Sequence, residues 1–233
     1  MPVKIKAWNH NTYYHRALLR LVPAHVERGL DVGCGDGTFA RRLASVCRQV
    51  TAMDADQEQV EFSRLTCAGL DNVEIRQGDV MSMDLEQEAF DLVTALAVVH
   101  HLPLESGLGK LRSLVRPGGR LLVLGVWTDD ATTGDRLRNH AAGTTNRLLQ
   151  RAWGPDRMEA PSIGPEVTLR EVRGRVADVL PGASVRRRLL WRYVLVWDKP
   201  LGSRTVGRAA GGRARLPALR ESLRTLPEGA RRG

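Results

Sequence analysis

A glycine-rich stretch and the acid that follows it carry the clearest chemistry in this chain. Residues 31–38 read DVGCGDGT, between an apolar segment and a helical pattern. Glycine at every second position lets the backbone turn sharply and approach a ligand closely, with amide groups and a helix N-terminus facing it. Asp54 ends the next apolar segment, about 20 residues further on, where a carboxylate can accept hydrogen bonds from both hydroxyls of a ribose. The spacing therefore predicts a ligand that contains a nucleoside.

The residue at position 38 decides between two kinds of nucleoside ligand. The dinucleotide fingerprint G-x-G-x-x-G needs a third glycine there for close helix packing beneath a pyrophosphate, and this chain has Thr38. Asp31 and Asp36 also place two carboxylates near the loop, which would repel phosphates but could hold the ammonium of an amino-acid moiety. S-adenosylmethionine therefore fits better than NAD, and a nucleotide-dependent oxidoreductase is disfavoured.

Five segments, taken in order, resemble the class I S-adenosylmethionine-dependent methyltransferases. LDVGCGDG at 30–37 is similar to the first motif of that family, and the match extends over roughly residues 28 to 126. Segments near both ends are similar to a group of small, uncharacterised bacterial methyltransferases. The other four segments of the match are 50–54 (VTAMD), 78–80 (GDV), 90–93 (FDLV) and 114–119 (LVRPGG), and the segments near the ends are WNHN at 8–11, Tyr14-His15, and LLWRY at 189–193.

The resemblance implies a cofactor site at the ends of the first four predicted strands. Asp79 takes the position with which the family recognises adenine, although an Asp after Gly78 is also typical of a turn. Asp31 is either a carboxylate that organises the loop or a contact to the methionine ammonium. The residues expected at the cofactor are Tyr14, Asp31, Gly33, Cys34, Gly35, Gly37, Asp54, Ala55, Asp79, Val80 and Leu96.

His100 and His101 are the candidate catalytic residues. Methyl transfer asks little of side chains, because the sulfonium is already activated, and a base helps only where the nucleophile must lose a proton. The pair follows the fourth predicted strand, which ends beside the transferable methyl, and a neutral imidazole titrates near pH 7. Alternatively, one histidine only bonds a loop and lines the wall. His101 is slightly favoured as the base, and His10 and His15 are weaker candidates.

Short Val/Leu-rich segments that alternate with helical patterns predict a Rossmann-like, doubly wound α/β fold, mostly parallel with antiparallel C-terminal strands. We expect an N-terminal cap at 1–27, a methyltransferase domain at 28–200 with a lid at about 127–165, and a basic, disordered tail at 201–233. The predicted strands are 28–32, 50–53, 73–76, 90–95, 120–126, 183–191 and 193–197, and helices are predicted at 56–68, from Pro103, at 135–153, and from Thr168 to a stop before Pro181.

The distribution of net charge and the absence of two base-methylation motifs indicate the class of methyl acceptor. Residues 201–233 hold eight Arg and two Glu, so most of the formal net charge of +9 belongs to the tail. The fourth strand continues as TALA at 94–97, without the Asn/Asp-Pro-Pro-aromatic motif used on exocyclic base amines, and the chain has no Pro-Cys nucleophile for pyrimidine carbons. A small-molecule acceptor is therefore predicted, and nucleic acid is disfavoured. An RNA-associated methyltransferase and a non-catalytic cofactor-binding module are the alternatives.

Cysteine spacing and hydropathy indicate the compartment. Cys34, Cys47 and Cys67 form no C-x-x-C pair, so we expect neither a disulfide framework nor a metal site. No apolar run reaches the roughly 18 residues that span a bilayer, and the first residues lack the apolar core of a signal peptide. A cytoplasmic protein without a membrane span is therefore expected.

Overall fold

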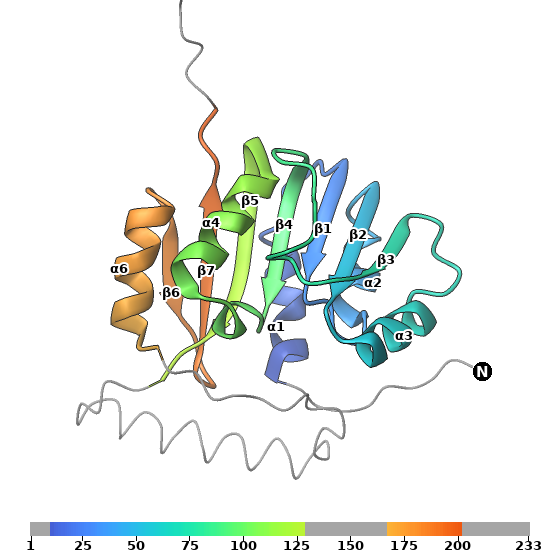
Figure 1. The fold of residues 1–233 in the computed structure, drawn as a ribbon, viewed down its shortest axis with the longest axis horizontal. Coiled ribbons are helices and arrows are strands. Elements are labelled where there is room, and N and C mark those ends of the chain that lie inside the picture. The colour runs from blue at the N-terminus through green and yellow to red at the C-terminus, as the bar shows by residue number, and fades with distance from the viewer. Residues whose placement is uncertain (1–9, 129–166, 202–233) are drawn as a thin grey trace, which may run out of the picture. The chain divides into compact units, whose positions relative to one another are not determined.

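A seven-stranded sheet in the order β3-β2-β1-β4-β5-β7-β6 forms the centre of the protein (Figure 1). The computed structural model describes residues 10–128 and 167–201. Strands β1 to β5 pair in parallel, and β7 runs antiparallel to both β5 and β6, which confirms the predicted fold class. The strands are β1 (Arg28–Val32), β2 (Gln49–Asp54), β3 (Val73–Gln77), β4 (Phe90–Leu96), β5 (Val115–Val126), β6 (Ser184–Arg187) and β7 (Arg192–Asp198).

Helices cover both faces of this sheet, and each face has its own apolar core. One core combines strand residues with the buried sides of α4 and α6, and Figure 1 shows α4 in front of the sheet. The other core takes its helical residues from α1 and α2, and α3 packs beside α2. The helices are α1 (His10–Leu19), α2 (Thr38–Leu43), α3 (Gln57–Thr66), α4 (Leu104–Leu114) and α6 (Leu169–Val179), with a short 3-10 turn, η1 (Val99–His101).

Local capping explains where the helices begin and end. The Asp56 carboxylate accepts a hydrogen bond from the Glu58 N–H at 2.8 Å and starts α3, and Gly69, with a φ of 80°, lies just past the end of that helix. Thr168 and Glu171 form the predicted capping box of α6. Pro103 is the residue immediately before α4, so its missing N–H removes no bond within the helix.

The prediction of a strand from 183 to 191 is wrong at its C-terminal end. β6 stops at Arg187, because Leu190 and Trp191 adopt left-handed φ angles of 59° and 54° and turn the chain into β7. β5 also starts five residues earlier than the predicted Arg120, with a register irregularity opposite the start of β4. Trp191 is half-buried, whereas the other two predicted packing residues, Tyr193 and Trp197, are each 2% exposed.

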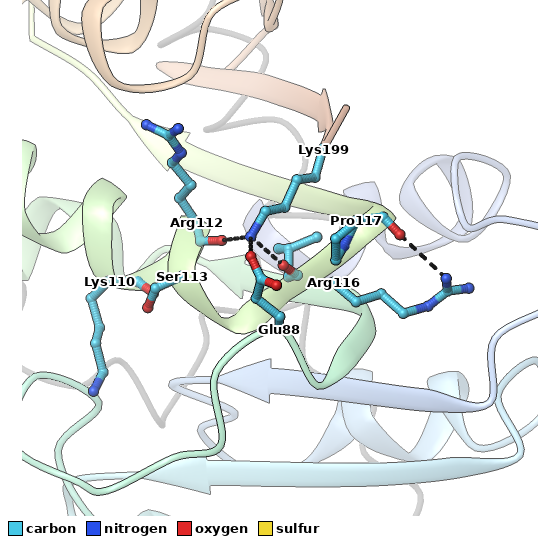
Figure 2. A network of polar contacts seen from close by, with 8 residues as sticks. Glu88, Lys110, Arg112, Ser113, Arg116, Pro117 and Lys199 are labelled. Atoms are coloured by element: carbon cyan, nitrogen blue, oxygen red, sulfur yellow. Dashed lines mark hydrogen bonds and ion pairs between the residues drawn. The ribbon is translucent and has the colours of Figure 1, made fainter. Parts of the chain in front are cut away.

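Lys199 fixes the C-terminal end of β7 at the sheet edge opposite the glycine loop. Its Nζ donates to the carbonyls of Val115 at 2.8 Å and Arg112 at 3.4 Å and pairs with Glu88 at 2.8 Å (Figure 2). Backbone bonds join Lys199 to Gly118 and Gly119 as well. The side chain of Lys199 is 14% exposed, so these contacts satisfy its donors away from bulk water. The network ties the antiparallel strand to the α4–β5 junction.

Several predictions concern residues outside the described ranges. The helix predicted at 135–153, most of the lid at about 127–165 and nearly all of the tail at 201–233 lie there. The proposed domain boundaries therefore stay predictions. Within 10–128 and 167–201, no helix has the length and apolar character needed to cross a bilayer.

Replacing Gly125 by Ala tests how tightly β5 and β7 pack. An added Cβ would stand 2.0 Å from Cζ of the buried Tyr193, so we expect the free energy of unfolding to fall by about 1–3 kcal/mol through overpacking. Gly174→Ala is the control, because nothing lies within 4 Å of a Cβ there and α6 gains about 0.5–1 kcal/mol from the better helix former. Urea unfolding measures both. Equal effects of the two substitutions would contradict the packing described.

Candidate active site

The carboxyl ends of β1, β2, β3 and β4 form one edge of the sheet, with the change in strand order between β1 and β4. Ligands of open α/β sheets bind in the crevice outside such a point. Figure 1 shows the arrowheads of β1 and β4 side by side at this edge, with α1 close by. The sequence-predicted cofactor residues lie on the loops and strand ends at this edge and on α1.

Steric contacts explain the glycines of the loop between β1 and α2. Gly33, Gly35 and Gly37 have left-handed φ angles of 63°, 53° and 78°. A Cβ on Gly33 would lie 2.1 Å from a methyl of Val98, and one on Gly37 would lie 2.8 Å from the Cα of Ser63. The backbone therefore approaches its neighbours too closely for any side chain at these two positions, and the loop keeps its amide groups at the crevice.

Asp54 holds the glycine loop in this shape. Its Oδ2 accepts a hydrogen bond from the Gly35 N–H at 2.8 Å, and its Oδ1 accepts one from the Asp56 N–H at 3.0 Å. A carboxylate has about four acceptor sites, so each oxygen keeps the capacity for one more donor, such as a ribose hydroxyl. Ala55, the next residue, is exposed. Asp54 thus organises the loop and retains the acceptor capacity that the prediction requires.

Asp31 is a buried carboxylate with one unsatisfied oxygen. It is 1% exposed, and its Oδ1 accepts a hydrogen bond from the Thr94 hydroxyl at 2.6 Å. Its Oδ2 is buried and has no hydrogen-bond partner among the residues that the structure describes. Burial raises the pKa of Asp31 to about 7. The Thr94 hydrogen bond acts to lower this pKa, and repulsion from the Asp54 charge acts to raise it. A cationic group beside Oδ2 would relieve both the missing hydrogen bond and the desolvation.

That unsatisfied oxygen tests whether the site fits S-adenosylmethionine. The methionine part of this cofactor carries an ammonium group, which supplies both the positive charge and the donors that Oδ2 of Asp31 lacks. The adenosine part carries a ribose, for which Asp54 keeps acceptor capacity. The donors and acceptors present therefore fit the predicted cofactor.

Asp79 forms the turn that the sequence also allowed. Its Oδ1 accepts from the Met81 N–H at 2.9 Å and its carbonyl accepts from the Met83 N–H at 2.8 Å. The Gly78 N–H donates to the Asp54 carbonyl at 2.8 Å, which brings this loop beside the glycine loop. Asp79 is exposed and Val80 is buried. The contact of these two residues with adenine stays a prediction.

Three other predicted cofactor residues have structural contacts of their own. The Tyr14 hydroxyl donates to the Leu189 carbonyl at 2.8 Å, and burial raises the pKa of Tyr14 to about 12. Leu96 is 9% exposed at the end of β4 and is followed by Ala97, whose φ of 56° is strained for a non-glycine residue. Burial raises the pKa of Cys34 well above its usual value, which disfavours a thiolate nucleophile.

The two candidate catalytic histidines lie side by side on η1. Their ring centroids are 3.9 Å apart, with His101 exposed and His100 half-buried. Nδ1 of His100 is buried without a hydrogen-bond partner, and burial, followed by the charges of His101 and Arg192, lowers the pKa of His100 to about 4. An imidazole with that pKa is neutral at pH 7 and a weak base there. The geometry therefore favours His101 over His100 as a proton acceptor.

The weaker histidine candidates gain nothing from the structure. His15 is 4% exposed against the ring of Phe39, with a centroid distance of 4.8 Å. Burial, with a contribution from the charge of Arg42, lowers the pKa of His15 to about 3. A base that weak does not take a proton from an acceptor at neutral pH. The side chain of His10 lies outside the described part of the chain.

Thr94 is a site residue that sequence reasoning missed. It sits in the fully buried β4, directly opposite Asp31 in the parallel register, and its hydroxyl bonds the one oxygen of Asp31 that is satisfied. The available signal was a single hydroxyl in an apolar strand, since a buried polar side chain needs a partner.

The described residues hold no cluster of three or more His, Cys, Asp or Glu side chains suited to a metal ion.

Comparison with known proteins agrees with this geometry. Residues 30–123 match the model of a methyltransferase domain. An uncharacterized methyltransferase of Mycobacterium tuberculosis (strain ATCC 25618 / H37Rv) is 35% identical over 198 residues, which cover 83% of this chain and 98% of that protein. A ubiquinone biosynthesis O-methyltransferase of Xanthomonas axonopodis pv. citri is 37% identical over 108 residues, 45% of this chain and 44% of that protein.

Solved structures share the fold. The N-methyltransferase NodS from Bradyrhizobium japonicum, in complex with S-adenosyl-L-homocysteine, superposes with a TM-score of 0.55 at 17% identity, covering 81% of this chain and 87% of that one. The YcgJ protein from Bacillus subtilis gives a TM-score of 0.57 at 20% identity, covering 76% and 71%. The glycine loop, the family model and the near full-length relative lead to one conclusion: this chain belongs to the class I S-adenosylmethionine-dependent methyltransferases.

Proposed function

We propose that this protein holds S-adenosylmethionine across the carboxyl ends of β1, β2 and β3 and methylates a small-molecule acceptor over the end of β4. The observation that carries the proposal is the buried Oδ2 of Asp31, which has no hydrogen-bond partner within residues 10–128 and 167–201. A carboxylate oxygen left unsatisfied in the core destabilises the fold. Its retention beside the glycine loop is explained by a cationic ligand that supplies the missing partner.

Each acid at this edge has its own part of the cofactor to bind. Asp31 pairs with the methionine ammonium, and Asp54 accepts hydrogen bonds from the ribose hydroxyls while it holds the Gly35 N–H. Asp79 and the N–H of Val80 receive the adenine. Tyr14 covers the site from α1, where its hydroxyl bond to the Leu189 carbonyl fixes its ring. These roles divide the edge into amino-acid, ribose and base subsites.

The residues of the chain act mainly by positioning the two reactants. When bound, S-adenosylmethionine supplies an activated methyl group that a nucleophile displaces directly. Holding two reactants in line can contribute about 7–11 kcal/mol of the barrier reduction. The end of β4, with the strained Ala97 and the η1 turn, forms the wall against which the acceptor lies. The predicted lid at about 127–165 would exclude water above it.

A proton must leave when the nucleophile is a hydroxyl or a phenol. His101 takes that proton, because it is exposed on the η1 turn that follows β4. His100 acts as a positioning residue, since its low pKa keeps it neutral and its ring packs against that of His101 at 3.9 Å. A charge on both rings at that separation would be repulsive.

Relatives support a small acceptor. Ubiquinone biosynthesis O-methyltransferases and a demethylmenaquinone methyltransferase share 31–37% identity with about two fifths of this chain or slightly more. None of the helices described at 10–128 and 167–201 could cross a membrane, which agrees with a cytoplasmic enzyme. The arginines of the predicted tail are the feature that an RNA-associated enzyme would use.

Methylation of a bacterial extract tests the acceptor class. The full-length protein and S-adenosylmethionine are incubated with a small-molecule fraction and, separately, with an RNA fraction. We expect one low-molecular-weight compound to gain the mass of a CH₂ unit, as seen by mass spectrometry, because small-molecule methyltransferases among the relatives support a small acceptor. Methylation of RNA alone would contradict the small-molecule acceptor and support an RNA-associated methyltransferase. Cofactor binding without any methylated product would support the non-catalytic module.

Asp54→Ala tests the ribose subsite. We expect affinity for S-adenosylhomocysteine to fall by about 1.5–3 kcal/mol, roughly tenfold to a hundredfold, because hydrogen bonds to a charged acceptor are lost. Isothermal titration calorimetry measures the change. Asp178→Ala, which removes an exposed carboxylate on α6, is the matched control and should bind normally. An unaltered affinity of the Asp54 variant would rule out its ribose role.

Asp31→Asn tests how much the buried carboxylate lowers the free energy of unfolding. Because folding raises the pKa of Asp31 from 3.8 to about 7, this residue favours the folded state at low pH, and that contribution is lost as the pH rises through 7. We expect the variant without ligand to be more stable than the parent at pH 8, by on the order of 2 kcal/mol, and little changed at pH 4. Its affinity for S-adenosylmethionine should drop.

Asp91→Asn is the control for this pH dependence. Burial alone would raise the pKa of Asp91, but hydrogen bonds from the Arg28 N–H and from Arg116 lower it, so its ionised form favours folding. The Asp91→Asn variant should therefore be less stable than the parent at pH 8, whereas Asp31→Asn should be more stable there. Urea unfolding at the two pH values distinguishes them. A loss of stability for Asp31→Asn at pH 8 would show that its carboxylate is already satisfied.

His101→Gln tests the proton acceptor once the methylated compound is known. For an acceptor that loses a proton, we expect kcat to fall by about 10²–10⁴ with unchanged affinity for S-adenosylhomocysteine. His25→Gln, an exposed histidine before β1, is the control. A full rate in His101→Gln would leave the pair with a structural role only.

A further inference from the structure

Helix α3 runs along the glycine loop and contacts it through two side chains one turn apart. A Cβ on Gly37 would lie 2.8 Å from the Cα of Ser63, and one on Gly35 would lie 3.7 Å from Oε1 of Gln59. Residues four apart in a helix share one face. The same face of α3 therefore packs against the loop at Gly37 and extends the Gln59 carboxamide to Gly35.

Gly35 is the glycine of this loop that has open space beside it. Other atoms would stand 2.1 Å from a Cβ at Gly33 and 2.8 Å from one at Gly37, so packing closes both positions. At Gly35, apart from the adjoining residues of the loop, the Gln59 oxygen at 3.7 Å is the only atom of the described residues within 4 Å of that point. The open side of the loop therefore lies at Gly35, and the Gln59 carboxamide borders it.

Asp54 reaches the same glycine from the end of β2. Its Oδ2 accepts the Gly35 N–H at 2.8 Å, so a carboxylate from β2 and a carboxamide from α3 both lie beside Gly35. An ionised carboxylate only accepts hydrogen bonds, whereas a carboxamide also offers two N–H donors. The two side chains are therefore complementary for a hydroxyl group, which can donate to one of them and accept from the other.

The two glutamines of α3 differ in their contacts. Gln57 is exposed, and its Nε2 donates to Glu61 at 3.2 Å. Gln59 is half-buried, and its backbone N–H donates to the Asp56 carboxylate at 3.4 Å, but its side-chain amide makes no hydrogen bond to any residue that the structure describes. The fold thus uses the backbone of Gln59 and leaves its carboxamide available at the loop.

We propose that Gln59 is a cofactor-binding residue whose carboxamide donates a hydrogen bond to a ribose hydroxyl, which in turn donates to Asp54. This inference rests on the proposed function and adds a residue to its ribose subsite. A hydroxyl bound by Asp54 alone keeps its own lone pairs without a donor, because a carboxylate has no proton to give. Nε2 of Gln59 supplies that donor. A neutral amide does so without the repulsion that a second carboxylate beside Asp54 would add.

Alanine substitution measures the contribution of the carboxamide. In the full-length protein, Gln59→Ala should weaken binding of S-adenosylhomocysteine about threefold to tenfold, since a hydrogen bond between neutral groups is lost. Gln57→Ala, the same change where the side chain bonds Glu61 instead, is the matched control and should bind as the parent does. Calorimetry measures both affinities. Equal affinities of the parent and Gln59→Ala would overturn the inference.

Analogues of S-adenosylhomocysteine that lack one ribose hydroxyl identify the group that Gln59 binds. The probes are the 2′-deoxy and 3′-deoxy compounds, which keep the adenine and the amino-acid part. We expect one of them to bind the parent less tightly and to bind Gln59→Ala as it binds the parent, because the bonded hydroxyl is already missing. The other analogue should still detect the substitution. Equal weakening of all three ligands by Gln59→Ala would move the amide elsewhere on the cofactor and overturn the ribose contact.

Gln59→Glu distinguishes a hydrogen-bond donor from an acceptor at this position. The substitution keeps the size of the side chain, removes both N–H donors and adds a negative charge beside Asp54. We expect this variant to bind S-adenosylhomocysteine at least as weakly as Gln59→Ala does. Gln57→Glu, which adds the same charge to α3, should bind as the parent does. Tighter binding by Gln59→Glu than by Gln59→Ala would show that the side chain accepts hydrogen bonds and would overturn its role as a donor.

Two further readouts separate this inference from a structural role and from the proposed function. Urea unfolding of Gln59→Ala should match the parent, and a loss of stability in step with the loss of affinity would assign the carboxamide to the fold and contradict the inference. Failure of the parent to bind S-adenosylhomocysteine would refute the proposed function. Parent binding that weakens with Asp54→Ala but not with Gln59→Ala would refute this inference alone.

Discussion

The hydrogen bond between Thr94 and Asp31 joins the two halves of the sheet at the point where the strand order reverses. Parallel pairing of β1 with β4 sets these residues opposite each other, and burial on both sides removes water from the carboxylate. Thr94 satisfies one oxygen, and the proposed ammonium contact would satisfy the other. The position of the glycine loop, the pKa of Asp31 and the proposed ammonium contact all follow from that register.

Asp54 stabilises the glycine loop and, in the proposed function, also binds the ribose of the cofactor. Its bond to the Gly35 N–H shapes the loop before any ligand is present, so the amide groups are already oriented when the cofactor arrives. A site that is formed in advance loses less entropy on binding. The glycines at 33 and 37 act together with Asp54, because close packing against Val98 and Ser63 leaves the loop no space to relax.

Local patterns in the sequence were sufficient for much of the fold and for the outline of the site. The spacing of the glycines and Asp54, the cap at Asp56 and the capping box at Thr168 depend on neighbouring residues alone, and the structure contains each of them. The role of Thr94 depends on strand register, which pairs residues 63 positions apart and leaves no local trace. The turn at Leu190 and Trp191 was missed because neither residue type favours a left-handed backbone.

The edge of the sheet formed by β6 has a consequence for how copies of this protein behave together. β6 is only four residues long and includes Arg186 and Arg187. An edge strand with unpaired backbone groups is a template for adding another chain, and short length and positive charge both oppose that addition. The short length of β6 and its two arginines therefore oppose intermolecular strand pairing and aggregation.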